Sequence, residues 1–424
     1  MIEHAIQTVH LLKIFKKLAI GSLTILLSSC TNLKAPKTLF ITYAVDQRDF
    51  RIERTRVRSI IDKYTEAFQR SNPETRIVYI TYTSGEFFQQ IERDSSLDLG
   101  PDLVITSQYP APELLKRNLT ITLPNQQYFD SIYSKRIQSI SKESNKYTFA
   151  PWIVETQLAC FNNTKIKTSP STISELEKLS ASGKKVGLAS NPYELIWTAG
   201  TQGAISEISS IGKQNPSKQT YPNIKKWLQW LRKAALYQNI YFLEDYKELT
   251  KKLTNNELDW VTCWSSQLEY LKKEMGSSLG TAALPNGSTS KALPTFLVHG
   301  FALGKNSSQA QRKTALKFIK TNVNTIAQRK LQLNDAGLLA ANQNVFIPPE
   351  SSKKLFAINT SFNQQSNHYF SEWPGIIRWF VPEERNSKNV GKRYKQLSAT
   401  LTELTDGYLT INEALKTITT TPTN

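Results

Sequence analysis

The sequence is poor in the residues from which catalytic and metal centres are usually built. Among 424 residues there are four histidines, three cysteines and two methionines. No His-Glu-x-x-His, no Cys-x-x-Cys and no phosphate-binding glycine-rich loop is present, so zinc protease, dithiol redox and P-loop chemistry are excluded. We therefore expect no metal, no cofactor and no enzymatic activity. The sequence alone does not exclude that two carboxylates come together in the folded chain, as a glycosidase requires.

Long hydrophobic runs are also absent. The one apolar segment, Leu18 to Leu27, follows three positive charges at Lys13, Lys16 and Lys17. Its ten residues are too few to cross a bilayer, which takes about 20. They match the hydrophobic region of a signal peptide, which spans about 7 to 15 residues.

The segment ends in Leu27-Ser28-Ser29-Cys30, which resembles the lipobox of bacterial lipoproteins. We therefore expect residues 1–29 to be a lipoprotein signal peptide, Cys30 to carry the lipid and residues 30–37 to be a tether. The protein would then lie in the cell envelope, anchored to a membrane and facing the periplasm or the cell exterior. A buried amphipathic N-terminal helix is the lower-ranked alternative.

The charge is strongly positive but not concentrated. The formal net charge is +18, yet no arginine-rich block and no basic stripe interleaved with aromatics occurs. Nucleic acid is therefore not an expected partner. A solvated basic surface near anionic lipid or cell wall fits better. The two further cysteines, Cys160 and Cys263, lie in apolar, strand-like runs and could form a disulfide or stay as buried thiols.

Hydrophobic patterns predict an α/β architecture. Strand-like and helical segments alternate through the first third of the chain, which is typical of a parallel sheet covered by helices. The length exceeds what one hydrophobic core usually serves, so two lobes are expected. The predicted strands are 38–45, 76–82, 101–105, 158–161, 186–189, 260–264 and 296–303, and the predicted helices are 57–68, 87–91, 173–179, 227–235, 315–319, 327–333, 394–404 and 411–418.

The order of short motifs resembles family 1 of the extracellular solute-binding proteins of ABC importers, the maltose-binding-like group. The resemblance covers nearly the whole chain after Cys30. The segments that carry it are Gly100–Val104, Lys146–Trp152 with Cys160–Asn162, Pro170–Leu176, Asn191–Glu194 as a loop that reaches the ligand, Ala283–Gly287 with Gly300–Leu303, Ala315–Ile319, Asn334–Ala341 and Gly407–Leu415.

This resemblance implies a two-lobed periplasmic-binding-protein-like fold of type II, each lobe a mainly parallel sheet flanked by helices. Lobe 1 would comprise residues 38–149 with 299–345, and lobe 2 residues 150–298 with 346–424. Crossing strands near 149–151 and 297–300 would be the hinges. The chain would act as a monomer that captures a small solute by hinge closure and delivers it to the membrane permease subunits.

Two departures from the family pattern concern the ligand. Thr106-Ser107-Gln108-Tyr109 stand where many maltose-type members have a Trp and an acidic residue, and Asn256-Glu257-Leu258-Asp259-Trp260 replace Gly-x-x-Ala-Met. A sugar or oligosaccharide is the favoured solute, and maltose itself is not implied. The alternative is the same fold with an organic anion, polyamine or metal complex. An exported polysaccharide-active enzyme or adhesin ranks lower.

Carbohydrates present apolar C–H faces and a rim of hydroxyls, so their sites combine flat aromatic rings with hydrogen-bonding groups. Near the end of the first strand, Asp46 and Arg48 could reach a cleft beyond the sheet, and an Arg there could bind an anion instead. For each Trp, core packing is the alternative. The candidate ligand-binding residues are Asp46, Arg48, Trp152, Glu155, Tyr193, Glu194, Trp260, Trp264 and Trp373.

Overall fold

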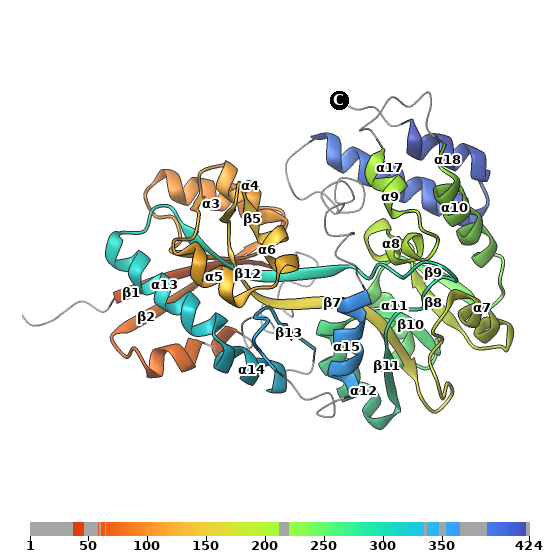
Figure 1. The fold of residues 1–424 in the computed structure, drawn as a ribbon, viewed down its shortest axis with the longest axis horizontal. Coiled ribbons are helices and arrows are strands. Elements are labelled where there is room, and N and C mark those ends of the chain that lie inside the picture. Colours follow the sequence, from red (N-terminus) through yellow and green to blue (C-terminus); the bar gives the residue numbers. More distant parts are fainter. Residues whose placement is uncertain are drawn as a thin grey trace, which may run out of the picture.

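The computed structural model describes residues 37–45, 58, 61–63, 65–211, 220–334, 337–346, 353–364 and 388–420. They form two α/β lobes joined by a pair of long strands (Figure 1). The strands are β1 (Lys37–Val45), β2 (Thr75–Thr83), β3 (Leu103–Ser107), β4 (Thr120–Ile121), β5 (Lys142–Glu143), β6 (Lys146–Tyr147), β7 (Ala150–Asn162), β8 (Val186–Ala189), β9 (Ile240–Leu243), β10 (Trp260–Trp264), β11 (Leu279–Ala282), β12 (Phe296–Gly304) and β13 (Leu339–Ala340).

The helices cover both faces of the sheet. They are α3 (Phe87–Ser96), α4 (Pro110–Lys116), α5 (Gln126–Ile132), α6 (Lys135–Ser141), α7 (Ile173–Ala181), α8 (Pro192–Thr201), α9 (Ile205–Ser210), α10 (Pro222–Ala234), α11 (Tyr246–Thr254), α12 (Leu268–Met275), α13 (Gln309–Val323), α14 (Thr325–Asn334), α15 (Lys353–Gln364), α17 (Lys388–Asp406) and α18 (Ile411–Thr419). Two 3₁₀ turns, η3 (Ser265–Gln267) and η4 (Gly276–Ser278), flank α12.

The sheet is continuous through both lobes, in the order β2-β1-β3-β12-β7-β10-β8-β9. Strands β2, β1 and β3 of lobe 1 are parallel, and so are β10, β8 and β9 of lobe 2. The crossing strands β7 and β12 run antiparallel to each other and to their neighbours. The sheet is therefore mixed where a mainly parallel one was expected, because the chain crosses between the lobes twice in opposite directions.

Strand β7 is 13 residues long and serves both lobes. Its first part, from Ala150, pairs with β12, and its last part, from Gln157, pairs with β10. A register shift between His299 and Gly300 interrupts β12 at the border of lobe 1. A Cβ on Gly300 would lie 2.0 Å from the Ala150 carbonyl oxygen, so only glycine allows this close approach of the two strands.

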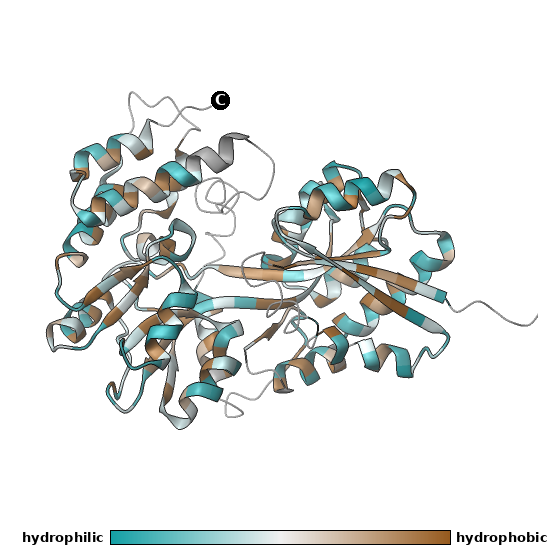
Figure 2. Cartoon of the chain, turned by 180° about the vertical axis from the view of Figure 1, so that it is seen from behind, coloured by the Kyte–Doolittle hydropathy of each residue, from teal (hydrophilic) through white to brown (hydrophobic). Residues whose placement is uncertain are grey.

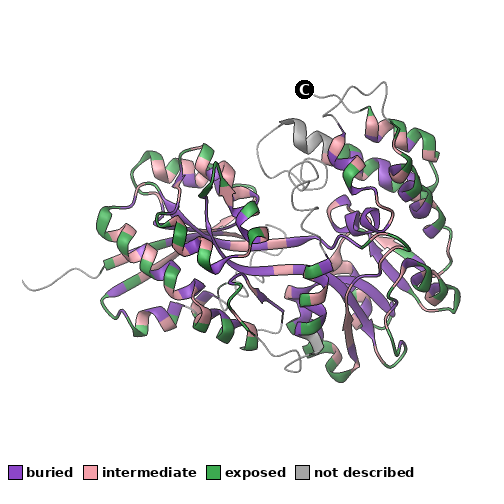
Figure 3. Cartoon of the chain, viewed as in Figure 1, coloured by how far each residue is buried: buried purple, intermediate pink, exposed green. Residues whose placement is uncertain are grey.

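Apolar residues line the strands, and the helices turn their charged faces outward (Figure 2). The strands and the inner helix faces are buried (Figure 3). In lobe 2 the C-terminal helices α17 and α18 pack on α10. Trp227 and Trp230 of α10 lie in the core, as the helical spacing predicted. Burial of these apolar surfaces is the main source of stability for each lobe.

Candidate functional site

The candidate site lies where the carboxyl ends of strands from both lobes come together. In open α/β sheets, ligands bind beyond the carboxyl ends of the strands. Strand β3 of lobe 1 leads into Gln108 and Tyr109, and strand β8 of lobe 2 leads into Tyr193 on α8. Strand β10 ends at Trp264. These residues lie beside the crossing strands, where the two lobes meet. Tyr193 is partly exposed, whereas Gln108, Tyr109 and Trp264 are buried.

On the lobe 1 side, Gln108 fixes the chain against the crossing strand. The Gln108 side chain is buried; its Nε2 donates to the Phe296 carbonyl at 3.1 Å and its Oε1 accepts from the Val298 amide at 2.6 Å. The backbone amide of Gln108 also donates to the Val298 carbonyl at 3.1 Å. These three bonds set the position of Tyr109 relative to β12.

On the lobe 2 side, two aromatic rings stack. The rings of Tyr193 and Trp264 lie with centroids 5.9 Å apart and planes 16° from parallel. The Tyr193 hydroxyl donates to the Phe296 carbonyl at 3.3 Å and lies 3.4 Å from the Tyr109 hydroxyl. The Tyr109 ring meets the Tyr193 ring edge-on, at 6.3 Å and 80°. Tyr109 of lobe 1 and Tyr193 of lobe 2 are therefore in contact, at the point where Tyr193 bonds to the Phe296 carbonyl of β12.

The sequence favoured a loop at Asn191–Glu194, but Pro192 to Glu194 form the first turn of α8. Asn191 is the N-cap and accepts from the Glu194 amide at 3.0 Å, and Pro192 follows at the first helical position. Asn followed by Pro is a common way to begin a helix. The helix holds Tyr193 in a fixed direction, which a loop would not.

Glu194 lies behind the aromatic pair and is buried. Its Oε1 accepts from Trp264 Nε1 at 3.4 Å, while its Oε2 has no hydrogen-bond partner among the described residues. Burial, with the charge of Asp245 adding to it, raises the pKa of Glu194 to about 8. The acid is thus held mostly neutral at pH 7, next to the rings that it positions.

Glu155 and His299 stand side by side on the two crossing strands. Glu155 Oε1 lies 3.1 Å from His299 Nε2, and both side chains are partly exposed. Side chains alternate between the faces of a strand, so Glu155 shares a face with Gln157. Gln157 Nε2 donates to the Glu194 carbonyl of α8 at 2.9 Å. Glu155 and His299 therefore face the same side of the crossing strands as α8. The His299 imidazole is thus half-buried beside an acid.

Trp152 and Trp260 lie in the core and offer no face to a solute. Strand alternation turns Trp152 away from the Glu155 face, and its ring packs 5.1 Å from the ring of Phe301. Trp260 is fully buried at the opposite end of β10 from Trp264, and its Nε1 donates to Ser169 Oγ at 3.0 Å. Four of the predicted residues, Cys30, Asp46, Arg48 and Trp373, lie outside the described residues.

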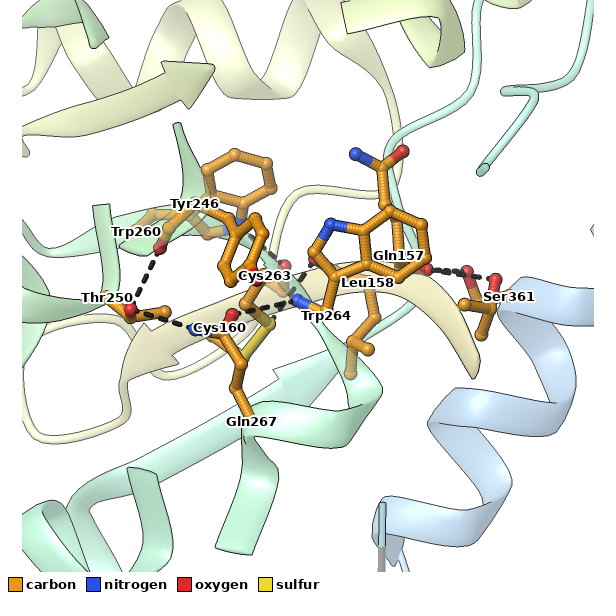
Figure 4. The surroundings of a disulfide bond; sticks show 12 residues. Gln157, Leu158, Cys160, Tyr246, Thr250, Trp260, Cys263, Trp264, Gln267 and Ser361 are labelled. Carbon is orange, nitrogen blue, oxygen red and sulfur yellow. Dashed lines mark hydrogen bonds between the residues drawn. A yellow bond between two sulfur atoms is a disulfide. The ribbon is translucent and has the colours of Figure 1, made fainter. Parts of the chain in front are cut away.

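A disulfide lies next to Trp264 in the sequence and in the sheet. Cys160 of β7 and Cys263 of β10 are bonded, across 103 residues of sequence (Figure 4). The sequence left this pairing open. In the structure the two cysteines are diagonal neighbours across the β7–β10 pair, with Cα atoms 5.9 Å apart, and they are bonded. Next to Cys263, the backbone amide of Trp264 donates to Gln267 Oε1 at 3.2 Å. The disulfide and this bond hold the end of β10 in place.

One sequence pattern that would suggest hydrolase chemistry does not form a site. Gly276–Gly280 matches Gly-x-Ser-x-Gly, the pattern around the nucleophile of many hydrolases. It joins a helix to a strand, the reverse of the strand-to-helix turn that exposes a nucleophile, and Ser278 Oγ donates to the Met275 carbonyl at 2.6 Å.

Across the described ranges, no group of three or more His, Cys, Asp or Glu could hold a metal ion. Within the same residues, no helix is long and apolar enough to cross a membrane.

Comparison with known proteins identifies the family. The sequence profile of the bacterial extracellular solute-binding proteins matches residues 62–357. No curated protein sequence matches the chain. Among solved structures, the GacH receptor of Streptomyces glaucescens has a TM-score of 0.68 at 12% identity, over 90% of this chain and 96% of that one. The maltodextrin-binding domain MalE of Bdellovibrio bacteriovorus has a TM-score of 0.62 at 16% identity, over 91% and 98%.

A cyclo/maltodextrin-binding protein solved with maltotetraose is similar to the same degree, with a TM-score of 0.68 at 13% identity, over 92% of this chain and 98% of that one. At such low identity the likeness shows the fold alone. It confirms the two-lobed, periplasmic-binding-protein-like architecture that the motif order implied.

Proposed function

The chain belongs to the bacterial extracellular solute-binding proteins, and from that premise we propose that it is the substrate-binding component of an ABC importer for a small carbohydrate. The observation that carries the proposal is the meeting of Tyr109, Tyr193 and Trp264 where the two lobes join. The Tyr193 ring is partly exposed and suits the apolar face of a sugar, while Tyr109 and Trp264 are buried against it and hold it in place. The similar structures in complex with acarbose, maltotriose and maltotetraose support the same class of solute.

Polar groups beside the rings suit a hydroxyl rim. Glu155 accepts hydrogen bonds, and His299 can donate or accept. Both project from the crossing strands on the side of α8. The mostly neutral Glu194 can position Trp264 without presenting a full charge to an uncharged ligand. Carboxyl groups on this side disfavour an organic anion over a neutral solute.

Capture occurs by closure of the two lobes around the solute. The part of the sheet that both lobes share is short: Val154–Thr156 of β7 pairs with Phe296–Val298 of β12. We place the hinge there, because Gln157 already pairs with lobe 2 while His299 already pairs with lobe 1. A solute that contacts both lobes stabilises the closed form by its additional contacts, and the permease recognises that form. No bond is made or broken in this chain.

The location follows from the N-terminal segment. Cys30 in its lipobox-like context anchors the chain to a membrane through the attached lipid, and residues 1–29 are removed as a signal peptide. The mature protein then acts as a monomer in the cell envelope. The lobe boundaries at 298/299 and 345/346 remain part of this proposal, and we place the boundary within β7 at the shared segment Val154–Thr156 instead of at 149/150.

A thermal-shift screen of the chain from residue 31 tests the proposed function. A solute that binds only the folded protein raises its melting temperature. We expect a shift with one class of mono-, di- or oligosaccharides, strongly reduced in Tyr193→Ala. Tyr270→Ala, which removes an exposed tyrosine of α12 that is not one of the three rings, is the matched control and should keep the shift. A shift with organic anions or polyamines only, or hydrolysis of a glycan, contradicts the proposal.

A further inference from the structure

One stretch of lobe 1 departs from the even distribution of charge in the rest of the chain. Residues 309–334, which form helices α13 and α14, contain six basic residues and no acidic residue. Arg312 is engaged in the fold, because its Nη2 donates to the Lys305 and Ser307 carbonyls at 3.2 Å each. The other five, Lys313, Lys317, Lys320, Arg329 and Lys330, are exposed.

On α13 the lysines form one row. Lys313, Lys317 and Lys320 are spaced four and three residues apart, which places them on one side of the helix. They border a surface hollow of about 520 Å³ that is also lined by Leu316. Lys320 Nζ lies 5.1 Å above the ring of Tyr128. Within the described parts of the chain, none of the three lysines pairs with a carboxylate.

On α14 the exposed side mixes cations with large apolar side chains. Ile326, Arg329, Lys330 and Leu333 occupy positions i, i+3, i+4 and i+7, so they share one face. Ile326 is 83% exposed and Leu333 is 52% exposed. The helix turns its buried residues, such as Leu331, to the lobe. Exposed aliphatic residues between cations are typical of a helix that lies on a bilayer surface.

The chain enters the structure on the same lobe. The described residues begin at Lys37 in β1, and α13 packs against β1 (Figure 1). Lys37 follows Cys30 by seven positions in the sequence, and an extended chain covers about 3.5 Å per residue. If Cys30 is anchored, the start of β1 lies within about 25 Å of the membrane. Helices α13 and α14 lie along the lower side of lobe 1 in this view, α14 being the nearer of the two to lobe 2, and both carry exposed residues (Figures 1 and 3).

We propose that the exposed face of α13 and α14, formed by Lys313, Lys317, Lys320, Ile326, Arg329, Lys330 and Leu333, binds the anionic surface of the membrane. We call it the basic face. The lysines and Arg329 attract phosphate headgroups, and Ile326 and Leu333 insert into the interface. The interleaved aliphatic residues favour a lipid surface over a soluble polyanion, which has no apolar layer to receive them.

This contact assigns different roles to the lobes. Lobe 1 rests on the bilayer through the basic face, while lobe 2 remains free to move against it about the hinge. The anchor alone would leave the body of the protein free to tumble on its tether. The inference rests on the proposed location at a membrane, but its test uses chain that lacks the lipid, so failure of the anchor and failure of the basic face are distinguishable.

Sedimentation with lipid vesicles tests the proposal. The chain from residue 31 keeps every described helix and strand, since these lie within 37–420. We expect it to bind vesicles that contain 30 mol% phosphatidylglycerol and not pure phosphatidylcholine vesicles, with loss of binding as salt is raised. Lys313→Gln/Lys317→Gln/Lys320→Gln should weaken binding roughly tenfold to a hundredfold, since each cation near such a surface contributes about 1 kcal/mol.

The matched control removes the same charge from lobe 2. Lys226→Gln/Lys272→Gln/Lys273→Gln changes three exposed lysines of α10 and α12 and should bind as the unchanged chain does. Ile326→Ser/Leu333→Ser should also weaken binding, at unchanged net charge. Equal loss in both triple variants would show general charge attraction and overturn the proposal. So would tight binding to soluble polyphosphate without binding to vesicles, or no loss in any α13 or α14 variant.

Discussion

The hydroxyls of Tyr109 and Tyr193 lie 3.4 Å apart, although one residue belongs to lobe 1 and the other to lobe 2. Gln108, the neighbour of Tyr109, bonds to Phe296 and Val298 in the part of β12 that the lobes share, and the first turn of α8 holds Tyr193. The Tyr193 hydroxyl and the Gln108 side chain donate to the same Phe296 carbonyl. A change in the angle between the lobes must therefore change this pair, and a solute between the lobes would contact both rings.

Loss of the lobe 1 ring should weaken solute binding. Tyr109→Ala removes the ring that faces Tyr193, and we expect an affinity about tenfold lower for the sugar found by the thermal-shift screen, because an aromatic contact contributes about 0.5–1.5 kcal/mol beyond its buried area. Tyr109→Phe keeps the ring and should lose less. Titration calorimetry measures both. An affinity unchanged in Tyr109→Ala would remove Tyr109 from the site.

Glu194 should make the stability of the protein depend on pH. In the unfolded chain its carboxyl has a pKa near 4.5, and burial raises the pKa to about 8 in the folded protein. Between these values the folded state binds more protons, so the free energy of unfolding falls as the pH rises and levels off above about pH 8.

Glu194→Gln removes this contribution. Between pH 4.5 and pH 8 the free energy of unfolding of the unchanged protein should fall by roughly 3–5 kcal/mol more than that of Glu194→Gln. Denaturant unfolding at a series of pH values measures it. Glu269→Gln, which changes an exposed glutamate of α12, should behave as the unchanged protein. Parallel curves for Glu194→Gln and the unchanged protein would contradict the assignment.

Reduction of the disulfide should destabilise lobe 2. The Cys160–Cys263 bond closes a loop across 103 residues, and such a cross-link contributes about 2–5 kcal/mol by restricting the unfolded chain. Cys160→Ala/Cys263→Ala should therefore lower the midpoint of denaturant unfolding, and a reductant should lower it in the unchanged protein but not in the double variant. A reductant effect of equal size in both proteins would show that it acts elsewhere.

Gly300 should tolerate no side chain. A Cβ there would lie 2.0 Å from the Ala150 carbonyl oxygen and 2.7 Å from the Phe149 ring, so the two crossing strands would have to separate. We expect Gly300→Ala to lower the free energy of unfolding by about 1–3 kcal/mol. Gly85→Ala is the control, because no atom lies within 4 Å of its added Cβ. Similar losses in both variants would argue against the close approach.

Much of the fold could be predicted from local patterns. The strands at β1, β2, β8, β10 and β12 and the helices α7, α10, α13 and α18 were predicted within a few residues or in part, because apolar residues recur in them at the spacing of a strand or an amphipathic helix. The sequence predicted only residues 158–161 of β7 as a strand. Its first half begins at Ala150-Pro151 and reaches into the other lobe, and only the pairing with β12 shows that it continues.

The site was harder to predict, because it depends on which residues meet. Tyr193, Glu194 and Trp264 were named from their chemistry, and Trp264 contacts both of the others. Glu155 was also named, and it lies beside His299 on the crossing strands. Tyr109 and Gln108 were noted only as departures from the family pattern, although their place at the end of a predicted strand was a usable signal. Trp152, Trp260 and Trp264 have the same chemistry and are all buried, and only the contacts of Trp264 with Tyr193 and Glu194 separate it from the other two.

The most direct test of the account is a distance measurement across the lobes. Spin labels at Lys116→Cys on α4 and Lys225→Cys on α10 would place one exposed label on each lobe, in the chain from residue 31 with the disulfide intact. On addition of the sugar that raises the melting temperature, we predict a shorter mean distance between the labels and a narrower distribution. In a labelled protein that also carries Tyr193→Ala, the same sugar should leave the distance distribution unchanged. A distribution that stays the same while the sugar binds would contradict capture by closure of the lobes.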